Sequence, residues 1–298
     1  MPEDGIVFSP KSEILSYEEL TRLCRIYSTL GIRKIRITGG EPFVRRDLMS
    51  FLRTISGDKL FERISITTNG TLTRPFLHEL SDLGIVDFNL SIDSLNKTRF
   101  EKIARRNCFD EVTLCMQELM KEPFQLKLNT VMMADVNEED FFPLIYLASE
   151  NKVDVRFIEE MPFNGTGIRE VPKWTATEMI KKLKGVYPDV VEQTSQLGST
   201  SQNFHIPGFK GRVGFIAAYT RSFCGTCNRI RLTPSGEMKT CLYAKSGLSV
   251  KELLRTGASD TSISEAILQS INHRYKNGWE AEEDRGVEVT ESMATIGG

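Results

Sequence analysis

The chain has 298 residues, of which 40% are hydrophobic and 26% are charged, and its net charge of −2 combines scattered residues of both signs. This composition is typical of a globular protein with one large α/β domain, or with one domain and an appendage. It argues against binding to nucleic acid or to an anionic membrane, and no apolar run approaches the roughly 18 residues of a membrane span.

Short β-rich runs alternate with amphipathic helical segments in the first half of the sequence. The strands are predicted at residues 34–38, 63–68, 87–92, 126–133 and 155–161. Their spacing is that of a βα repeat, and right-handed crossovers between such units build a parallel sheet or barrel. Ser16 and Glu19 predict a capping box before a helix at residues 17–30. Pro75 and Gly84 bracket a shorter helix.

The pattern changes in the second half of the sequence. A polar stretch at residues 191–203 interrupts the βα repeat, and the segment after it predicts short strands with glycine turns. A cysteine-rich segment follows, and then two helices, of which one begins with a capping box of Ser249 and Glu252. We therefore expect a βα domain over residues 1–172 and a smaller C-terminal domain over residues 173–298.

Polar residues gather at the C-terminal ends of the predicted strands. These ends read Thr38-Gly39-Gly40-Glu41, Thr67-Thr68-Asn69-Gly70, Ser91-Ile92-Asp93-Ser94 and Glu159-Glu160-Met161. Each end alone is typical of an ordinary loop, but ligands of α/β proteins bind at this edge of the sheet. The agreement among the strands therefore predicts a shared site, in which Glu41 could accept a hydrogen bond from an ammonium group.

Two basic residues, Arg36 and Lys127, lie within predicted strands that are otherwise largely apolar. A buried charge is costly unless it is paired with a carboxylate or directed at a ligand. If both side chains point into a barrel, they suit an anionic substrate such as a phosphate. The alternative is that each one reaches a neighbouring carboxylate.

Cys224, Cys227 and Cys241 have the spacing of a metal site. The start of the chain lacks the basic and apolar regions of a secretory signal, so we expect reduced thiols in a cytosol-like compartment. The three thiols predict either a zinc site completed by a distant ligand or an iron–sulfur cluster with one open iron. The remaining cysteines, Cys24, Cys108 and Cys115, fall in helical segments and are interpreted as inert thiols.

Arg229 and Arg231 alternate on an extended run next to these cysteines, so their side chains point the same way. Two guanidinium groups beside a cluster suit the oxygens of a phosphate, and a single nucleotide held by a few arginines is compatible with the net charge. The alternative is a solvated, charged strand face.

Several segments together resemble the GTP 3′,8-cyclases, a family of radical S-adenosylmethionine enzymes. They are "MPEDG", "RITGGEP", "TTNG", "LSIDSL", "EEMPF", "PGFKGRVGFI", "FCGTCNRIRLTPSGEMKTCL" and the final "GG". The resemblance extends over essentially the whole chain. It implies a partial TIM-type (β/α)6 barrel with a small C-terminal domain that carries an iron–sulfur cluster.

The resemblance also implies roles for individual residues. GTP would be held by Arg36, Thr67, Lys127, Arg229, Ile230 and Arg231. S-adenosylmethionine would contact Gly40, Ser91 and Met161, with Glu41 near its amino group. A 4Fe–4S cluster whose open iron meets the guanine would be held by Cys224, Cys227 and Cys241. A di-glycine tail, Gly297 and Gly298, would reach toward the active site.

The activity implied by the resemblance is that of a lyase, which converts GTP to 3′,8-cyclo-7,8-dihydro-GTP in the first step of molybdenum cofactor biosynthesis. In the family, a 5′-deoxyadenosyl radical takes a hydrogen from C3′ of the ribose, and the carbon radical adds to C8 of guanine. The implied partners are an electron donor protein, the synthase that makes cyclic pyranopterin monophosphate, and a second copy of the chain. The implied compartment is the cytoplasm, or the mitochondrial matrix in a eukaryote.

One feature of the family is missing, because the 298 residues contain no Cys-x3-Cys-x2-Cys motif. In the family this motif holds a second, N-terminal 4Fe–4S cluster after the first barrel strand, and its last cysteine immediately precedes the segment that begins here at Met1. We therefore expect a barrel without its first strand and no radical formation by the chain as written.

A downstream start or a truncation of an active enzyme explains this better than a degenerate protein does. The alternative function is a non-catalytic GTP-binding protein with a single iron–sulfur cluster. A third interpretation is a zinc-stabilised α/β domain of unrelated function.

Overall fold

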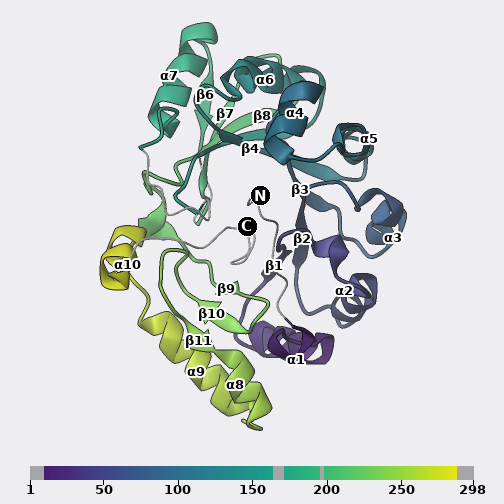
Figure 1. Cartoon of the computed structure of the whole chain (residues 1–298), viewed down its shortest axis with the longest axis vertical. Helices are drawn as coiled ribbons and strands as arrows, with labels where there is room; N and C mark the ends of the chain where they lie inside the picture. The colour runs from purple at the N-terminus through teal and green to yellow at the C-terminus, as the bar shows by residue number, and fades with distance from the viewer. Residues whose placement is uncertain (1–9, 164–170, 195–197, 287–298) are drawn as a thin grey trace.

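The computed structural model describes residues 10–163, 171–194 and 198–286. Within these ranges, a curved eight-stranded sheet has the order β1-β2-β3-β4-β5-β8-β7-β6 (Figure 1). Its strands are β1 (Lys34–Ile37), β2 (Arg63–Thr68), β3 (Asp87–Ser91), β4 (Gln125–Met132), β5 (Asp154–Glu159), β6 (Val191–Gln193), β7 (Ser201–His205) and β8 (Arg212–Ile216). The first five confirm the predicted strands to within two residues.

The sheet is parallel from β1 through β5 to β8, and β7 and β6 continue it in antiparallel pairing. The curved sheet and the helices outside it form a partial TIM-type barrel, as expected, and no closed barrel is seen among the described residues. The sixth parallel strand, β8, comes from beyond the expected domain boundary at residue 172. That boundary stays a prediction, and the sheet continues across it.

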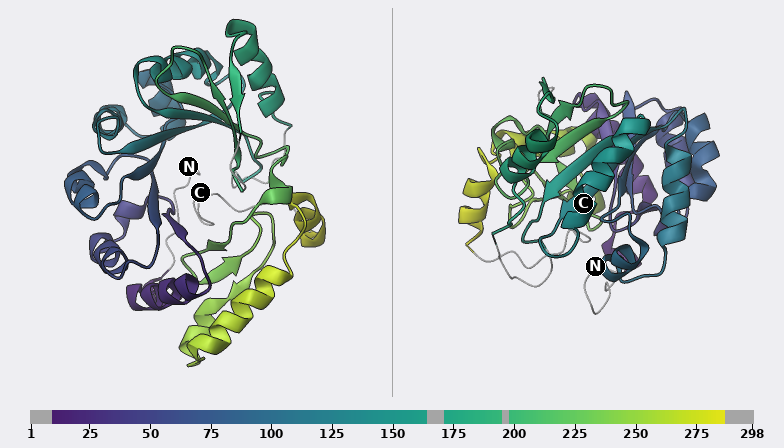
Figure 2. Two further views of the ribbon diagram at one scale, coloured as in Figure 1. Left: turned by 180° about the vertical axis from the view of Figure 1, so that it is seen from behind. Right: turned by 90° about the horizontal axis from the view of Figure 1, so that it is seen from above.

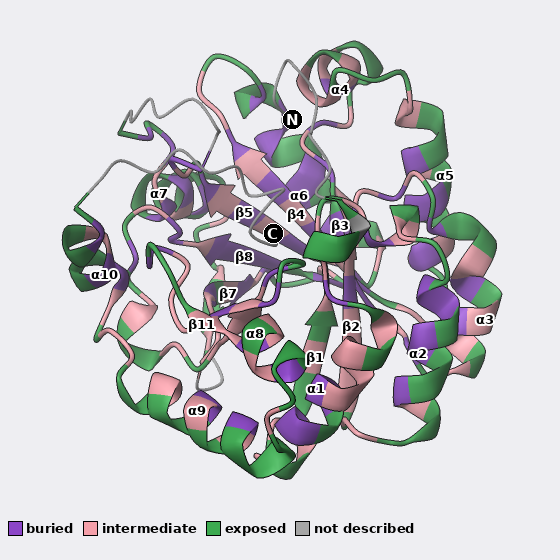
Figure 3. Cartoon of the chain, turned by 60° about the horizontal axis from the view of Figure 1, so that its bottom comes forward, coloured by how far each residue is buried: buried purple, intermediate pink, exposed green. Residues whose placement is uncertain are grey.

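Helices cover the convex side of the sheet (Figures 1 and 2). They are α1 (Tyr17–Thr29), α2 (Leu48–Gly57), α3 (Leu77–Asp82), α4 (Lys97–Ala104), α5 (Phe109–Leu119), α6 (Phe141–Glu150) and α7 (Ala176–Val186). The predicted capping box of α1 is confirmed, because Ser16 Oγ accepts from the Glu19 N–H and the Glu19 carboxylate accepts from the Ser16 N–H. Apolar side chains between helices and sheet form the main core. Figure 3 colours the buried residues of these elements purple.

Short 3₁₀ helices lie between these elements at Lys11–Glu13, Pro42–Val44, Arg74–Phe76, Glu138–Asp140 and Cys224–Thr226. The third one contains Pro75 and leads directly into α3, which ends just before Gly84 at φ +73°. In the described part of the chain, no helix combines the length and the apolar character that a membrane crossing requires.

The C-terminal segment packs back against the start of the chain. It forms a three-stranded sheet of β9 (Arg231–Leu232), β10 (Glu237–Lys239) and β11 (Leu248–Ser249), followed by α8 (Val250–Arg255), α9 (Asp260–Asn272) and α10 (Gly278–Arg285). Side chains of α1, α8 and α9 share a second apolar core. Ion pairs join Arg22 to Asp260 (2.7 Å) and Glu19 to Arg255 (2.8 Å). The small sheet consequently lies across the open side of the large one (Figure 1).

A buried carboxylate, that of Glu159 at the end of β5, joins the two expected domains. It accepts hydrogen bonds from the backbone N–H groups of Ala176 (2.7 Å), Tyr219 (2.8 Å) and Thr220 (2.7 Å). The Thr220 hydroxyl also donates to it. Because Glu159 is fully buried and well satisfied, it fixes the start of α7 and the segment after β8 relative to the parallel strands.

Gly214 of β8 leaves room for polar side chains inside the curved sheet. A Cβ atom at this position would lie 2.3 Å from Ser201 Oγ and 2.8 Å from Asn203 Oδ1. We expect Gly214→Ala to lower the free energy of unfolding by about 1–3 kcal/mol in urea titrations, because the core is overpacked. The control is Gly185→Ala in α7, where a Cβ meets nothing within 4 Å. It should be neutral or stabilising by about 0.5–1 kcal/mol, and equal effects of the two substitutions would contradict the explanation.

Candidate functional site

A cavity of about 2990 Å³ occupies the concave side of the large sheet and continues between it and the C-terminal segment. Ten of the residues expected to bind GTP or S-adenosylmethionine line it, namely Arg36, Gly40, Glu41, Thr67, Ser91, Lys127, Met161, Arg229, Ile230 and Arg231. The structure therefore brings together residues from β1–β5 and from the segment around β9. Gly297 and Gly298 lie outside the described residues.

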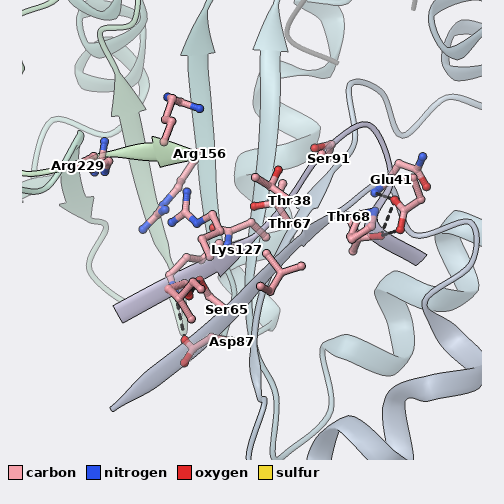
Figure 4. A pocket seen from close by; sticks show the side chains of 18 of the residues that line it. Thr38, Glu41, Ser65, Thr67, Thr68, Asp87, Ser91, Lys127, Arg156 and Arg229 are labelled. Carbon is pink, nitrogen blue, oxygen red and sulfur yellow. Dashed lines mark hydrogen bonds and ion pairs between the residues drawn. The ribbon is translucent and has the colours of Figure 1, made fainter. Parts of the chain in front are cut away.

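Of the basic residues that line this cavity, we call five the cationic cluster: Arg36, Lys127, Arg156, Arg229 and Arg231. Figure 4 shows Lys127 and Arg156 projecting from neighbouring strands into the same space, with Arg229 reaching it from the C-terminal segment. Alternation along β1, β4 and β5 directs Arg36, Lys127 and Arg156 to the concave face. Arg229 and Arg231 line the cavity and do not form the solvated, charged strand face that was the alternative for these two residues.

The cationic cluster is electrostatically strained without a ligand. Burial, together with the nearby guanidinium groups of Arg229 and Arg156, lowers the pKa of Arg36 to about 10. Burial also lowers the pKa of Lys127, and the nearby charge of Arg156 adds to the effect. Positive charges in one enclosed space repel each other, so an anion bound among them would be stabilised by all of them.

Two carboxylates at the N-terminal ends of the strands balance part of this charge. Asp87 accepts hydrogen bonds from the guanidinium of Arg63, and its Oδ1 lies 3.5 Å from Lys127 Nζ. Asp154 is occupied by Arg212 through bonds of 2.9 and 2.6 Å. The alternative considered for Lys127, that it reaches a neighbouring carboxylate, is therefore partly realised by Asp87. Lys127 shares this carboxylate with Arg63. The pairing leaves the cluster with an excess of positive charge.

Unpaired polar atoms mark the same surface. Thr67 Oγ1, Asn89 Oδ1, Asn129 Oδ1 and Arg156 Nε are buried without a hydrogen-bond partner among the described residues. Thr67 is in register with Asn89 across β2 and β3, and Asn129 with Arg156 across β4 and β5. Because buried polar atoms are almost always satisfied in native proteins, four such atoms on adjacent strands indicate the position of a polar ligand.

The loop before β7 orients Arg229. Its Nη2 donates to the Gly198 carbonyl oxygen (3.0 Å) and to Thr200 Oγ1 (3.3 Å). Burial lowers the pKa of Arg231, and the thiols of Cys227 and Cys241 act against that shift, so this arginine lies close to both. Ile230 also borders the cavity and packs against the second apolar core. The arginine run thus connects the cationic cluster to the cysteines.

The strand ends expected to contact S-adenosylmethionine surround another part of the cavity. The Glu41 carboxylate accepts from Thr68 Oγ1 (2.9 Å), from the Asn69 N–H (2.8 Å) and from the Phe43 N–H (3.3 Å). Burial raises its pKa, although these hydrogen bonds favour the ionised form. Glu41 therefore ties the end of β1 to the end of β2 (Figure 4), and its contact with an amino group stays a prediction.

The adjoining strand end contributes another carboxyl. Asp93 Oδ1, after β3, accepts from the Val131 N–H (2.9 Å), and burial raises the pKa of Asp93 to about 6. Ser91, two residues earlier, is exposed to the cavity. Burial therefore favours the protonated form of both carboxyl groups at this end of the cavity, although Asp93, with a pKa of about 6, is still mostly ionised at pH 7.

The three cysteines of the expected cluster flank the Arg229-Ile230-Arg231 run, which lines the cavity, and are not themselves among the lining residues. Cys224 begins a 3₁₀ helix, Cys227 follows it, and Cys241 comes two residues after β10. All three are free thiols of intermediate burial. Burial raises the pKa of Cys241, and the thiols of Cys224 and Cys227 add to this increase, so the three thiols lie within electrostatic range of one another.

Within the described ranges, no three His, Cys, Asp or Glu side chains converge on the position of a single metal ion. The donor set of three neighbouring thiols beside arginines fits a larger iron–sulfur cluster. Cys24 and Cys115, by contrast, are buried core thiols whose pKa values are raised to about 12 and about 11 by burial, and Cys108 lies at the start of α5. Their spread over helices agrees with the interpretation of inert thiols.

Three residues of the site were missed in the sequence: Arg156, Asn89 and Asn129. The signal for Arg156 was present, because it interrupts an apolar strand in the same way as Arg36 and Lys127 do. Asn89 and Asn129 alternate with buried apolar residues in β3 and β4. A polar residue at an inward position of a predicted parallel strand is the pattern that identifies them.

Comparison with known proteins gives two family matches. Residues 3–147 match the Radical SAM superfamily, and residues 153–279 match the family described as Molybdenum Cofactor Synthesis C. A GTP 3′,8-cyclase of Clostridium perfringens (strain 13 / Type A) is 36% identical over 282 residues, which cover 93% of this chain and 87% of the relative.

Animal relatives are longer. The molybdenum cofactor biosynthesis protein moc-5 of Caenorhabditis elegans is 35% identical over 93% of this chain and 48% of its own length. Molybdenum cofactor biosynthesis protein 1 of Drosophila melanogaster is 38% identical over 91% of this chain and 47% of its own length. The chain therefore spans about half the length of these curated relatives.

Solved structures show the same fold at low sequence identity. Streptococcus suis SuiB has a TM-score of 0.61 and 12% identity, over 89% of this chain and 64% of that chain. SuiB bound to S-adenosylmethionine has a TM-score of 0.59 and 14% identity, over 83% of this chain and 59% of that chain.

Proposed function

The chain belongs to the GTP 3′,8-cyclase family of radical S-adenosylmethionine enzymes, and on this basis we propose that its cavity binds GTP for the first step of molybdenum cofactor biosynthesis. The product of that step would be 3′,8-cyclo-7,8-dihydro-GTP. The cationic cluster, enclosed together with unpaired polar atoms on the neighbouring strands, is the observation that supports this proposal most.

The triphosphate is assigned to the cationic cluster, because charge-assisted bonds from several guanidinium groups fit its oxygens. Thr67 and the Arg229-Ile230-Arg231 run would hold the rest of the nucleotide. The bonds from Arg229 to the 198–200 loop leave its other N–H groups for the substrate. A nucleotide fixed at several points presents one ribose hydrogen for reaction, which is an orientation effect.

S-adenosylmethionine is assigned to the strand ends around Gly40, Ser91 and Met161, with Glu41 nearby. Cys224, Cys227 and Cys241 would hold a 4Fe–4S cluster, for which three neighbouring free thiols are a suitable donor set. Met161 and Cys241 belong to one small apolar group around Phe163, which would place the two cofactors next to each other. When bound, these groups supply the radical chemistry, and the chain supplies binding and orientation.

The ligands of a second cluster are absent from these 298 residues, which contain no Cys-x3-Cys-x2-Cys motif. Cys24, Cys108 and Cys115 do not replace it, because Cys24 lies in α1, the other two lie at the start and in the middle of α5, and two of the three are buried. We propose that this chain alone binds GTP and one cluster and forms no radical. A non-catalytic GTP-binding protein with a single cluster is the second candidate function.

Anaerobic reconstitution with iron and sulfide tests the proposal. We expect about four irons and no zinc per chain, together with a change in the EPR spectrum of the reduced cluster when GTP is added. Zinc at one ion per chain, or a spectrum that GTP leaves unchanged, would contradict it.

Catalysis is tested separately, by adding S-adenosylmethionine and a reductant to the reconstituted chain. No 5′-deoxyadenosine should form, and it should form when the motif is supplied on an N-terminal extension. Product from the chain alone would contradict our account of the second cluster. Failure with the extension would favour the non-catalytic candidate.

The remaining partners follow from the family. We propose an electron donor protein, the synthase that makes cyclic pyranopterin monophosphate as the consumer of the product, and a homodimer. The compartment would be the cytoplasm, or the mitochondrial matrix in a eukaryote. Co-purification of the tagged chain tests the protein partners, and light scattering tests the dimer.

A further inference from the structure

A fully buried cation lies three residues before the first cysteine of the cluster segment. The side chain of Arg221 has no exposed surface. Its Nη1 donates to the Gly278 carbonyl oxygen (2.8 Å), and its Nη2 donates to the carboxylate of Glu282 (2.8 Å). Both partners belong to α10, so this arginine joins the cysteine segment to the last described helix.

Two aromatic rings enclose the same guanidinium. Its central carbon lies 3.5 Å from the ring centroid of Tyr243 and 3.9 Å from that of Trp279. Stacking on two rings compensates part of the cost of burying the charge. Arg221 also has a positive φ of 57°, which is uncommon for a residue with a side chain. The backbone is thus turned so that this side chain enters the space between the rings.

The contacts of Arg221 connect two of the three cysteines. The Cys224 N–H donates to the Arg221 carbonyl oxygen (3.1 Å), which anchors the turn that carries Cys224. Tyr243 lies two residues after Cys241, and its hydroxyl donates to the Ala218 carbonyl oxygen (3.1 Å). Arg221 therefore holds the turn before Cys224 against the segment after Cys241.

Gly278 completes the contact. A Cβ atom at this residue would lie 3.1 Å from Arg221 Cδ, 3.1 Å from Tyr243 Cδ2 and 3.5 Å from Cys224 Sγ. A side chain at the first residue of α10 would therefore meet the arginine, the aromatic ring and a cysteine sulfur at once. Only a residue without a side chain fits there unless its neighbours move.

We propose that Arg221 is a positioning residue of the three-cysteine site, which keeps Cys224 and Cys241 at the separation that the cluster needs and makes α10 part of that site. The inference rests on the proposed function, because it concerns the cluster assigned there. The charge of Arg221 is paired with the Glu282 carboxylate (2.8 Å), and the residue reaches the cysteines through the turn before Cys224 and through Tyr243.

The test measures how fast iron leaves the reconstituted 298-residue chain in the presence of a chelator. Arg221→Met keeps the bulk of the side chain but removes its charge and hydrogen bonds. We expect iron release to accelerate about tenfold or more, as is usual when an outer partner of a metal ligand is removed. Arg221→Lys, which keeps the charge, should recover part of the retention.

The control is Arg22→Met, which removes an ion pair to Asp260 (2.7 Å) and a bond to the Ala258 carbonyl oxygen in the distant α1–α9 contact. It should leave iron release unchanged. Melting temperatures of the iron-free variants show whether folding is affected, since a merely structural role would lower them without changing iron release from the folded protein.

The possible failures are distinguishable. A wild-type chain that retains no iron would overturn the proposed function. A wild-type chain that retains iron, with Arg221→Met releasing it at the same rate, would overturn only the role of Arg221. If Arg221→Met does not fold, Glu282→Gln removes the counter-charge and leaves the stacked cation in place. Release at the wild-type rate in that variant would also overturn the inference, whereas faster release would support it.

Discussion

Replacing Cys227 with alanine is expected to reduce the iron content of the reconstituted chain from about four atoms to nearly none. The three thiols form the entire protein ligand set that we propose, and an exposed 3₁₀ turn separates Cys224 from Cys227. Two remaining thiols hold a cluster too weakly to survive desalting. Iron and sulfide analysis, together with the visible absorption of the cluster, measures the loss.

Cys108→Ala is the matched control for this prediction. Cys108 is also a free thiol of intermediate burial, but it lies at the start of α5, away from the cysteine segment. Its replacement should leave the iron content at the wild-type level. Equal iron in the two variants would show that the cluster is held elsewhere, and it would remove the basis of the proposed function.

Arg156→Met is expected to weaken GTP binding by about 10- to 100-fold, which corresponds to about 1.5–3 kcal/mol for a lost bond to a charged group. The same substitution should leave the unliganded chain equally stable or more stable. Burial and the neighbouring cations lower the pKa of Arg156, and methionine removes a buried charge from a site of excess positive charge. Calorimetry with GTP and urea unfolding without it measure the two effects.

The control for Arg156 is Arg53→Met on the outer helices, where Arg53 pairs with Glu79 at 2.5 Å. An exposed ion pair of this kind contributes little, so both GTP affinity and stability should change only slightly. Unchanged GTP affinity in Arg156→Met would contradict the assignment of the triphosphate to the cationic cluster. A large loss of stability in that variant would show that Arg156 supports the fold and not a ligand.

Local patterns in the sequence predicted the elements well. The strands β1–β5 follow from short β-rich runs, and the start of α1 from Ser16 and Glu19, because each depends on interactions within a few residues. The inward direction of Arg36 and Lys127 followed from their isolation in apolar strands. Arg156 carries the same signal and was missed, because the strand around it also contains acidic residues at its end.

The sequence by itself determined the parallel βα repeat, the three-cysteine segment and the alternation of Arg229 with Arg231, since these depend on spacing along the chain. Only the tertiary structure decided that β8 pairs with β5, that the C-terminal sheet lies across the open side of the large one, and that Arg221 stacks between Tyr243 and Trp279. The physical reason is that hydrophobic periodicity and capping residues specify where a helix or strand forms, but not which other helix or strand it packs against. A partner tens of residues away is selected by the packing of the whole core, which local patterns do not encode.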